Sequence, residues 1–503
     1  MTGAPSRAYG WYALGLLAFL NLLSFVNRNV IFALFDPIKR DLRLTDAQLG
    51  WLASGYVLVF ALAALPFGLL GDLRSRRGVI AWGVVLWSAC TIAGGFATDF
   101  GELLVARALA GAGGAAFGAA AQSLAADYFP SRGRAVALGI LATGITLGGV
   151  LGIWLGGRLE AAYGWRMALV SVSLPGFLLA GPAARLRDPV RPPRFISIAA
   201  AWNELGIGLT ALVRQLYPLL IGLAVGGGLA FQLDRVYGAD STVDVAAFGA
   251  AVALGLALNI RIWVRRVAGA PSAGPSGLAR AFGELAASLT LVLRTRTLVY
   301  VFLGGAFISF GVNGLVGWAP TFMARELNLS VAQAATLLGT WGLVAAISGT
   351  VCGGLVADSL LRRTPTGRVL TVALGLLIGG PLTLWLLTVR DLALFVPLFF
   401  AAFFFISWYS GPIAAVIFDV VPARISATVA GAYLLFIHLV GDTVAFPLVG
   451  ALSDRFGIDR AVLVLPSVAI AGGLVILLAT ATVARDMARA EAESGLSTST
   501  ASS

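Results

Sequence analysis

The sequence predicts an all-α protein that crosses a membrane many times. Of its 503 residues, 59% are hydrophobic and only 12% are charged, whereas a soluble domain carries about 25% charged residues. The apolar residues are gathered in long runs, and about 20 of them in a row can cross a bilayer as a helix. Such a run must be helical, because lipid offers the backbone no hydrogen-bond partner. The composition therefore excludes a soluble globule and a disordered chain.

We expect about fourteen membrane spans, taken as the apolar runs long enough to cross the bilayer. The first six lie near residues 11–35, 48–70, 79–97, 102–126, 134–158 and 165–184. An additional pair lies near 216–233 and 243–263, and the last six lie near 297–320, 331–357, 366–388, 391–417, 425–450 and 461–483. Glycines within 111–114 and 144–157 predict close contacts between helices.

These runs divide the chain into four parts. We expect a six-helix bundle over residues 1–185, cytoplasmic linker helices with two extra spans over 186–296, and a second six-helix bundle over 297–484. The stretch 201–214 resembles 281–294, and each is expected to be an amphipathic helix on the membrane surface. The tail over 485–503, beginning at Arg485, is rich in Ala, Ser and Thr and is expected to be disordered.

Loop charge predicts the orientation. Basic residues concentrate in every second loop, and such loops face the cytoplasm in membrane proteins. With an even number of spans, both termini are then cytoplasmic, and we expect the cell membrane as the location. A nucleic-acid-binding protein would gather its basic residues on one surface, so the net charge of +11 does not indicate a nucleic-acid partner here. The basic clusters are Arg74/Arg76/Arg77, Arg132/Arg134, Arg185/Arg187/Arg191/Arg194, Arg265/Arg266 and Arg362/Arg363/Arg368.

The chain repeats itself. The glycine-rich loop from Gly68 to Arg77 recurs from Gly354 to Arg363, and 129–135 recurs loosely as 421–427. A third match relates Gly157-Arg-Leu and the following Tyr163-Gly-Trp-Arg to 450–452 and 456–460. Three matches in the same order predict two parallel six-helix halves, an architecture in which transporters bind substrate between the halves.

The repeated loop is a candidate gate. Its glycines allow two helices to approach closely, and its charges can form a lock that opens when the halves move. The same arginines also fit the ordinary excess of basic residues in cytoplasmic loops, and both interpretations can hold. The expected gate residues are Gly68, Gly71, Asp72, Arg76 and Arg77 in the first copy and Asp358 and Arg362 in the second.

Few ionisable residues lie inside the spans, where they are costly and indicate function. They are Arg28, Arg107, and the pair His438 and Asp442, which stand one helical turn apart and can share a proton. Two arginines suit the capture of a phosphate or carboxylate, because a guanidinium can bind either through two parallel hydrogen bonds. Alternatively, Arg28 and Arg107 pair with helix carbonyls or with Asp442 for structural reasons alone.

Polar and aromatic residues near these charges complete the expected substrate site. Asn21 shares one helix face with Arg28, and Asn27 lies beside that face. Asn313, Trp318 and Tyr409 are placed to line a cavity and contact a lipid-like chain, although aromatic residues in membrane helices often serve in packing or interfacial belts.

No enzyme-like motif is present. We find no metal-ligand cluster, phosphate loop or catalytic triad, so no cofactor and no enzymatic activity are expected. A primary pump would need a nucleotide-binding motif. Cys90 and Cys352 lie inside apolar runs and imply no disulfide framework.

The motifs resemble one family. Loop 68–78 and its second copy are similar to the signature of the major facilitator superfamily, and Arg107-x-x-x-Gly111-x-Gly113 resembles its span-four motif. Within that superfamily the chain most resembles the spinster-type lipid transporters, which implies lysophospholipid or sphingosine phosphate as the class of substrate. That resemblance rests on 24–28, 68–72, 318–322, 438–442 and 450–454.

The chain also departs from this family. The family usually has an aspartate directly before the span-one arginine, where this chain has Asn27, and a span-four glutamate where it has Gly114 or Ala115. The resemblance assigns proton coupling to those acids. Without them, either Asp442 with His438 carries the proton, or transport is uncoupled or uses another ion.

The leading hypothesis is a secondary transporter that moves an amphipathic, anionic or zwitterionic molecule such as a lysolipid by alternating access. Its expected partners are that substrate, membrane lipids and protons. A multidrug:proton antiporter is the first alternative, since fourteen-span antiporters carry a similar central pair, but cation efflux would favour unpaired acids in the cavity. A non-transporting sensor or scaffold is the second, and the intact gate motifs argue against it.

Overall fold

The computed structural model describes residues 7–73, 75–129, 131–188, 291–422 and 425–500, with scattered residues between 217 and 262. For a few of them, Asp72 included, only the backbone is described. The chain forms two compact units. Unit 1 comprises Met1–Gly206 and Gly317–Leu343, and unit 2 comprises Ile207–Val316 and Val344–Ser503. Regular structure in the described ranges is entirely helical.

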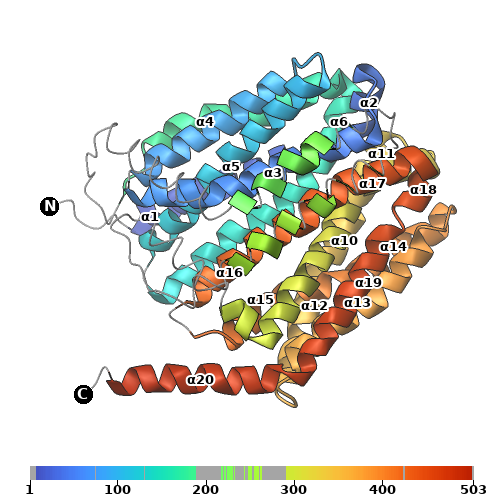
Figure 1. Cartoon of the computed structure of the whole chain (residues 1–503). Coiled ribbons are helices and arrows are strands. Elements are labelled where there is room, and N and C mark those ends of the chain that lie inside the picture. Colours follow the sequence, from blue (N-terminus) through green and yellow to red (C-terminus); the bar gives the residue numbers. More distant parts are fainter. Residues whose placement is uncertain are drawn as a thin grey trace. The chain divides into compact units, whose positions relative to one another are not determined.

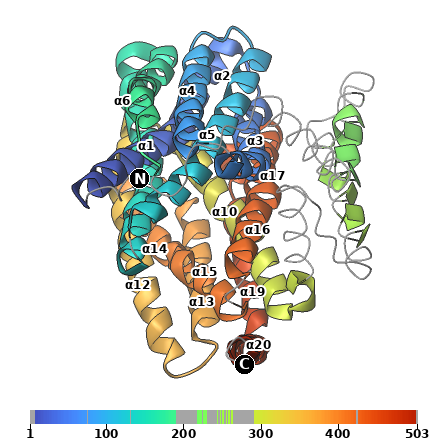
Figure 2. The same ribbon diagram turned by 90° about the vertical axis from the view of Figure 1, so that its left-hand side faces the viewer.

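Unit 1 is built on the first six predicted spans. Its helices are α1 (Arg7–Ala33), α2 (Phe35–Leu42), α3 (Asp46–Leu73), α4 (Arg76–Gly94), α5 (Phe100–Tyr128) and α6 (Ser131–Ala184). Figures 1 and 2 show α4, α5 and α6 alongside one another, and α1 packs on α6. Two predicted spans lie on α6 and are separated by a kink at Gly164. The end of α10, all of α11 (Val331–Leu337) and the π-helical turn η1 (Leu338–Gly342) also belong to this unit.

Unit 2 carries the last six predicted spans except for residues 317–343. Its elements begin with most of α10 (Arg296–Glu326), drawn in yellow in Figure 1. They continue with α12 (Leu343–Leu361), α13 (Gly367–Leu386), α14 (Leu392–Ile406), η2 (Ser407–Tyr409), α15 (Ser410–Asp419), α16 (Ser426–Ile437), η3 (His438–Asp442), α17 (Thr443–Phe456), α18 (Ile458–Ala461), α19 (Val464–Leu478), η4 (Ala479–Ala481) and α20 (Val483–Thr500).

The membrane spans agree with the sequence prediction. Eleven helices in the described ranges are long and apolar enough to cross a bilayer. All twelve expected core spans fall on them, because the helix Val136–Ala184 covers two. The expected additional pair, near 216–233 and 243–263, lies largely outside the described residues, as do the amphipathic stretches 201–214 and 281–290.

The two halves of the sequence share local geometry, as the repeat predicts. Gly164 and Gly457 occupy the same place in the repeat, and both have positive φ, at +78° and +86°. A β-carbon is strained in that region, so both kinks favour glycine. A further match follows α2 and α10, where Arg43 and Asn328 both have φ of 53°.

A capping box follows each of these left-handed residues. Thr45 and Gln48 exchange two hydrogen bonds of 2.9 and 3.2 Å at the start of α3. Ser330 and Gln333 make the same pair of bonds, 2.8 and 3.2 Å long, at the start of α11. Such reciprocal bonds satisfy two backbone donors that a helix start leaves open.

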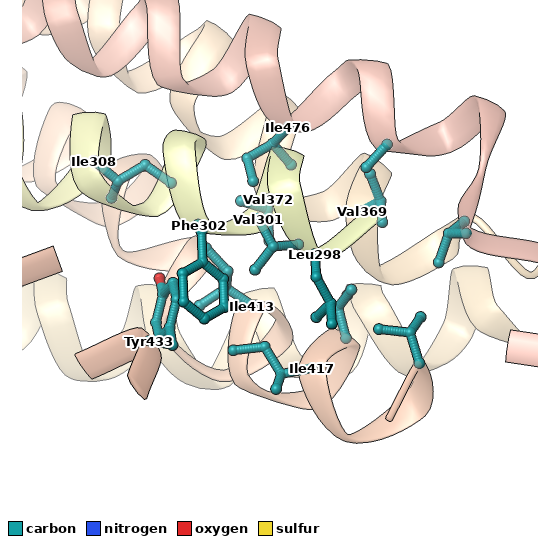
Figure 3. Packing of buried hydrophobic residues seen from close by; sticks show 14 of the residues in the cluster. Leu298, Val301, Phe302, Ile308, Val369, Val372, Ile413, Ile417, Tyr433 and Ile476 are labelled. Atoms are coloured by element: carbon teal, nitrogen blue, oxygen red, sulfur yellow. The ribbon is translucent and has the colours of Figure 1, made fainter. Parts of the chain in front are cut away.

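The core of unit 2 surrounds the first half of α10 (Figure 3). Leu298 and Phe302 are buried among residues of α13, α15, α16 and α19, and the Phe302 ring meets that of Tyr433 edge to face with centroids 5.4 Å apart. Such packing must hold the helices together, because lipid tails are as apolar as the side chains and leave no hydrophobic driving force.

The tail differs from the prediction. Residues 483–500, expected from Arg485 onward to be disordered, form α20, which leaves α19 at an angle in Figure 1. The physical reason is Asp486, which is buried and accepts hydrogen bonds from the backbone N–H (3.1 Å) and the hydroxyl (2.7 Å) of Thr297. Asp486 therefore caps the start of α10 and anchors the tail to unit 2.

Candidate functional site

Arg107 on α5 is a buried cation of unit 1, and its side chain is 1% exposed. Its guanidinium donates to the main-chain carbonyls of Asn27 (3.1 Å) and Arg28 (2.9 Å) on α1. It also lies over the ring of Tyr56 on α3, 4.9 Å from the centroid. Its Nε is buried without a hydrogen-bond partner in the described part of the chain. None of these contacts is a carboxylate, so the charge is met only by dipoles.

Arg28 is the second cation of this region. Its side chain is half-buried and its guanidinium lies 5.8 Å from the centroid of the Phe25 ring. It is close enough to Arg107 for the two charges to repel each other. The structure thus brings together the two arginines that the sequence predicted for substrate binding, and Tyr56 lies within electrostatic range of both.

Asn27 has a different environment from the one expected of a substrate ligand. It is 1% exposed, and its amide donates to the Ser173 hydroxyl on α6 at 2.7 Å. Its oxygen accepts from the Thr91 hydroxyl on α4, also at 2.7 Å. The amide therefore joins three helices, and both of its polar ends are already occupied.

Asn21 also joins helices. It is buried, and its amide donates to the carbonyl of Leu141 on α6 at 2.7 Å. Glycine-lined contacts support the same interface, since a β-carbon at Gly152 would lie 2.6 Å from the carbonyl oxygen of Val26. This bears out the expectation that glycines of 144–157 permit close approach.

Tyr56 is the residue of this region that sequence reasoning missed. A β-carbon at Gly114 would lie 2.6 Å from the Tyr56 hydroxyl, so this phenol fills the space that a side chain at 114 would need. A side chain at position 114 would therefore have to displace the Tyr56 hydroxyl. No motif marks this residue, because the same span also holds Trp51, Phe60 and Phe67.

A second polar site lies in unit 2, around Asp442. The carboxylate is fully buried and accepts a hydrogen bond from the Ser309 hydroxyl on α10. It also accepts from the Asn313 amide at 2.9 Å, and its other oxygen lies 2.7 Å from Nδ1 of His438. His438 and Asp442 bound the π-helical turn η3, and single π-helical turns are frequent at functional sites.

The aromatic residues predicted for the substrate site fall in different units. Tyr409 ends η2 in unit 2, packs against the core around Phe302 and lies within electrostatic range of Asp442. Trp318 belongs to unit 1, is fully buried and packs on Phe35 with ring centroids 5.1 Å apart. Asn313 thus belongs with Tyr409 and Asp442, whereas Trp318 is a packing residue near α2.

One predicted gate arginine, Arg76, and one that was not predicted as a gate residue, Arg368, pair with acids at the ends of α5 and α15. Arg76 is buried and forms an ion pair with Asp127. In the second copy Arg368 pairs with Asp419 and lies 3.7 Å from Asp358. Each arginine stands 51 residues before its aspartate, which gives both copies the same lock.

The remaining predicted gate residues take smaller parts in the described structure. Arg77 and Arg362 are exposed. Gly68 approaches α5, since its β-carbon would lie 3.6 Å from that of Ala119. The side-chain position of Asp72 and the surroundings of Gly71 lie outside what the structure describes. Arg368, which the sequence placed only among the basic loop residues, takes the pairing expected of Arg362.

The chain is similar in sequence to several known proteins. Protein spinster of Drosophila melanogaster is 23% identical over 455 residues, which cover 88% of this chain and 62% of the fly protein, less than two thirds. The sphingosine-1-phosphate transporter SPNS2 of Xenopus tropicalis is 30% identical over 173 residues, 33% of this chain and 34% of that protein. An MFS-type efflux pump of Mycolicibacterium smegmatis is 25% identical over 494 residues, 96% of this chain and 95% of the pump.

A solved structure has the same fold. It is a bacterial homologue of the human lysosomal transporter spinster, matched with a TM-score of 0.71 at 22% sequence identity over 96% of this chain and 99% of that one. The chain shares the fold of this solved transporter, and its apolar helices make it a multi-pass membrane protein. A family model, Major Facilitator Superfamily, matches residues 17–441. Because that match covers most of the sequence, the chain belongs to the Major Facilitator Superfamily of transporters.

Proposed function

We propose that this protein is a secondary active transporter of the cell membrane that moves an amphipathic, anionic or zwitterionic molecule, such as a lysolipid, by alternating access. The superfamily fold supports the transport mechanism, and the spinster and SPNS2 relatives support a lipid-like substrate. The loop charges support a topology with both termini in the cytoplasm.

The observation that carries the proposal is the pair Arg28 and Arg107. Two guanidiniums that repel each other lie in the membrane-spanning part of unit 1, and the contacts of buried Arg107 include no carboxylate in the described part of the chain. An intramembrane cation is costly, so an anionic headgroup would relieve both the repulsion and the cost. Arg28, which is the less buried of the two, is the direct ligand in this proposal.

Arg107 then acts mainly on Arg28. Its Nη1 and Nη2 hold the backbone of α1 at residues 27 and 28, and its guanidinium lies over the Tyr56 ring. This arrangement fixes the backbone position of Arg28, from which its side chain extends, and adds positive potential to the headgroup site. Arg107 is therefore a positioning residue in this proposal.

In this proposal, Asp442 and His438 form the proton site. A fully buried carboxylate that faces an imidazole at 2.7 Å can exchange a proton with it. The Ser309 hydroxyl and the Asn313 amide stabilise the charged form of Asp442 by donating to it. Coupling through this site would replace the span-one and span-four acids that this chain lacks.

The test is uptake of a fluorescent lysolipid into proteoliposomes, with and without a proton gradient. Arg28→Ala should abolish uptake, because no other half-buried guanidinium of this site remains to bind the headgroup. Arg28→Lys should keep a reduced rate, since it keeps the charge but not the two parallel hydrogen bonds. Arg158→Ala is the matched control, because Arg158 is an exposed arginine of the same unit that lies 5.3 Å from the Trp154 ring centroid.

Uptake by Arg28→Ala at the rate of the parent protein would refute the headgroup assignment. A multidrug exporter is the second candidate, favoured by the efflux-pump relative that covers nearly the whole chain. It predicts that a cationic dye, and not the lysolipid, is transported in the same vesicles. That outcome would replace the lipid proposal.

A further inference from the structure

We propose that residues 317–343, here named the strap, are a hinged element that Arg325 clamps to α2 and α3 in one state of the transport cycle. The strap comprises the end of α10, all of α11 and η1. It packs with unit 1, although the helices that continue from both of its ends belong to unit 2. The inference rests on the proposed alternating-access mechanism and adds a device that selects between its states.

The clamp is an arginine held by two carboxylates. Arg325 Nε and Nη2 lie 2.9 and 2.6 Å from Oδ1 of Asp36 on α2. Its Nη1 and Nη2 lie 2.7 and 2.9 Å from the two oxygens of Asp46 at the start of α3. The bond to Asp46 is bidentate, which is the strongest geometry for this pair of groups.

Burial raises the free-energy cost of breaking the clamp. Asp46 is 2% exposed and also binds Lys39 at 2.6 Å, while Arg325 and Asp36 are partly buried. An ion pair on an open surface is worth little, but removing one partner of a buried pair leaves an uncompensated charge. Withdrawal of Arg325 would therefore remove one of the two cations described here at the buried Asp46 carboxylate and leave Lys39. When the strap is released, another interaction must compensate the free energy of this buried charge.

The first hinge lies where α10 passes from one unit to the other. Val316 is the last residue of unit 2 in α10, and Gly317 is the first of the strap. Pro320 lies inside the helix four residues after Val316 and has no N–H to donate to its carbonyl. One helical hydrogen bond is therefore missing at the unit boundary, and kinks occur at such positions.

The second hinge lies at the other end of the strap. Leu343 is its last residue, and the π-helical turn η1 ends directly before it, at Gly342. A π-helical turn interrupts the regular hydrogen-bond ladder and often marks a functional site. Both helices that cross the unit boundary thus carry a backbone irregularity at the crossing.

The strap lies against α6 through small residues. A β-carbon at Gly157 would lie 2.6 Å from that of Ala335, and one at Gly339 would lie 3.0 Å from the Trp154 ring. These two are van der Waals contacts, so undocking the strap there would break no hydrogen bond or ion pair. Among the contacts described above, the bonds of Arg325 to Asp36 and Asp46 are therefore the main polar interaction between the strap and the rest of unit 1.

The clamp is absent from the other copy of the repeat. The matched capping boxes align Arg325 with Arg40, and the same alignment places Thr321 and Val331 where the first copy has Asp36 and Asp46. Arg40 is exposed and donates only weakly, at 3.4 Å, to the carbonyl of Asp36 in its own helix. The duplication alone does not explain the clamp, because only one copy has both acids.

The test is hydrogen–deuterium exchange of the full-length protein in lipid nanodiscs, which needs no substrate. Arg325→Ala should make peptides covering 321–340 exchange several times faster, because the docked strap loses its tie. Asp36→Asn, which leaves the Asp46 bond, should give a smaller increase in the same peptides. Arg166→Ala is the matched control, since it removes an arginine–aspartate pair, Arg166 with Asp41, that does not involve the strap.

Strap peptides that exchange at the parent rate in both Arg325→Ala and Asp36→Asn would overturn the clamp, and so would an equal increase in Arg166→Ala. Pro320→Ala tests the hinge, because it restores the missing donor. It should lower lysolipid turnover in proteoliposomes while the exchange of α11 stays at the parent rate, and unchanged turnover would overturn the hinge. If the parent protein transports no lysolipid, the substrate proposal fails, but the exchange experiment still decides the clamp.

Discussion

The amide of Asn27 offers a direct test of whether this residue holds the bundle together or binds cargo. The side chain is 1% exposed and bonds Ser173 and Thr91 at 2.7 Å each. Asn27→Ala removes both bonds at once. It also leaves the Thr91 hydroxyl buried without its acceptor, whereas Ser173 keeps its own bond to the Leu169 carbonyl at 2.9 Å.

These contacts set the expected loss of stability. The bond to Ser173 contributes about 1 kcal/mol net, and the Thr91 hydroxyl, left buried without its acceptor, costs about 1–3 kcal/mol. The free energy of unfolding should therefore fall by about 2–4 kcal/mol in Asn27→Ala. The measurement is SDS-induced unfolding of the purified protein in mixed micelles, followed by tryptophan fluorescence.

Asn29→Ala is the matched control. Asn29 lies two residues further along the same helix, is half-buried and donates only to the carbonyl of Phe25 in its own helix, at 2.9 Å. Its removal should change the free energy of unfolding by no more than about 0.5 kcal/mol. A stable Asn27→Ala protein with a raised KM for lysolipid would refute the structural assignment and restore Asn27 as a ligand.

Three further predictions follow from other contacts. Asp442→Asn should remove the pH dependence of lysolipid flux in proteoliposomes, and pH-driven accumulation that persists would exclude this residue as the proton site. Asp486→Ala should lower the free energy of unfolding by about 1 kcal/mol, as measured in mixed micelles, because the Thr297 N–H loses its cap. Arg166 donates to Asp41 and, with a smaller contribution from Trp165, holds the pKa of that carboxyl below its usual value. The resulting stability is present above about pH 4 and is lost as the pH falls through the lowered pKa, so Arg166→Ala should show a smaller acid-induced drop in unfolding temperature than the parent protein.

Much of the fold could be predicted from the sequence, because a membrane imposes a simple rule on it. Apolar runs of sufficient length must become helices, and all twelve core spans lie where the runs are. The repeat also matches Gly164 with Gly457, and the structure gives both glycines a positive φ. The prediction for the tail differs from the structure for a local reason. Its composition is polar, but one buried carboxylate, Asp486, attaches it to α10.

The candidate site was less predictable, because residue type does not reveal which side of a helix is already occupied. Arg107 and Asp442 stood out as charges within apolar runs, and both are buried in polar surroundings. Asn27 and Trp318 also stood out, but they face neighbouring helices. Ser309 and Tyr56 carry common side chains without a motif, so their positions beside Asp442 and Arg107 emerge only from the packing.

The two copies of the repeat share their backbone devices and differ in their buried chemistry. Both have the capping box, the positive-φ glycine and the arginine–aspartate lock over 51 residues. Only the first has a buried arginine held by carbonyls, and only the second has a buried carboxylate beside a histidine, within the described residues. Because a charge in the membrane costs free energy wherever it stands, a charge kept in one copy alone favours a function specific to that copy. This division of charge supports placing the headgroup site in unit 1 and the proton site in unit 2.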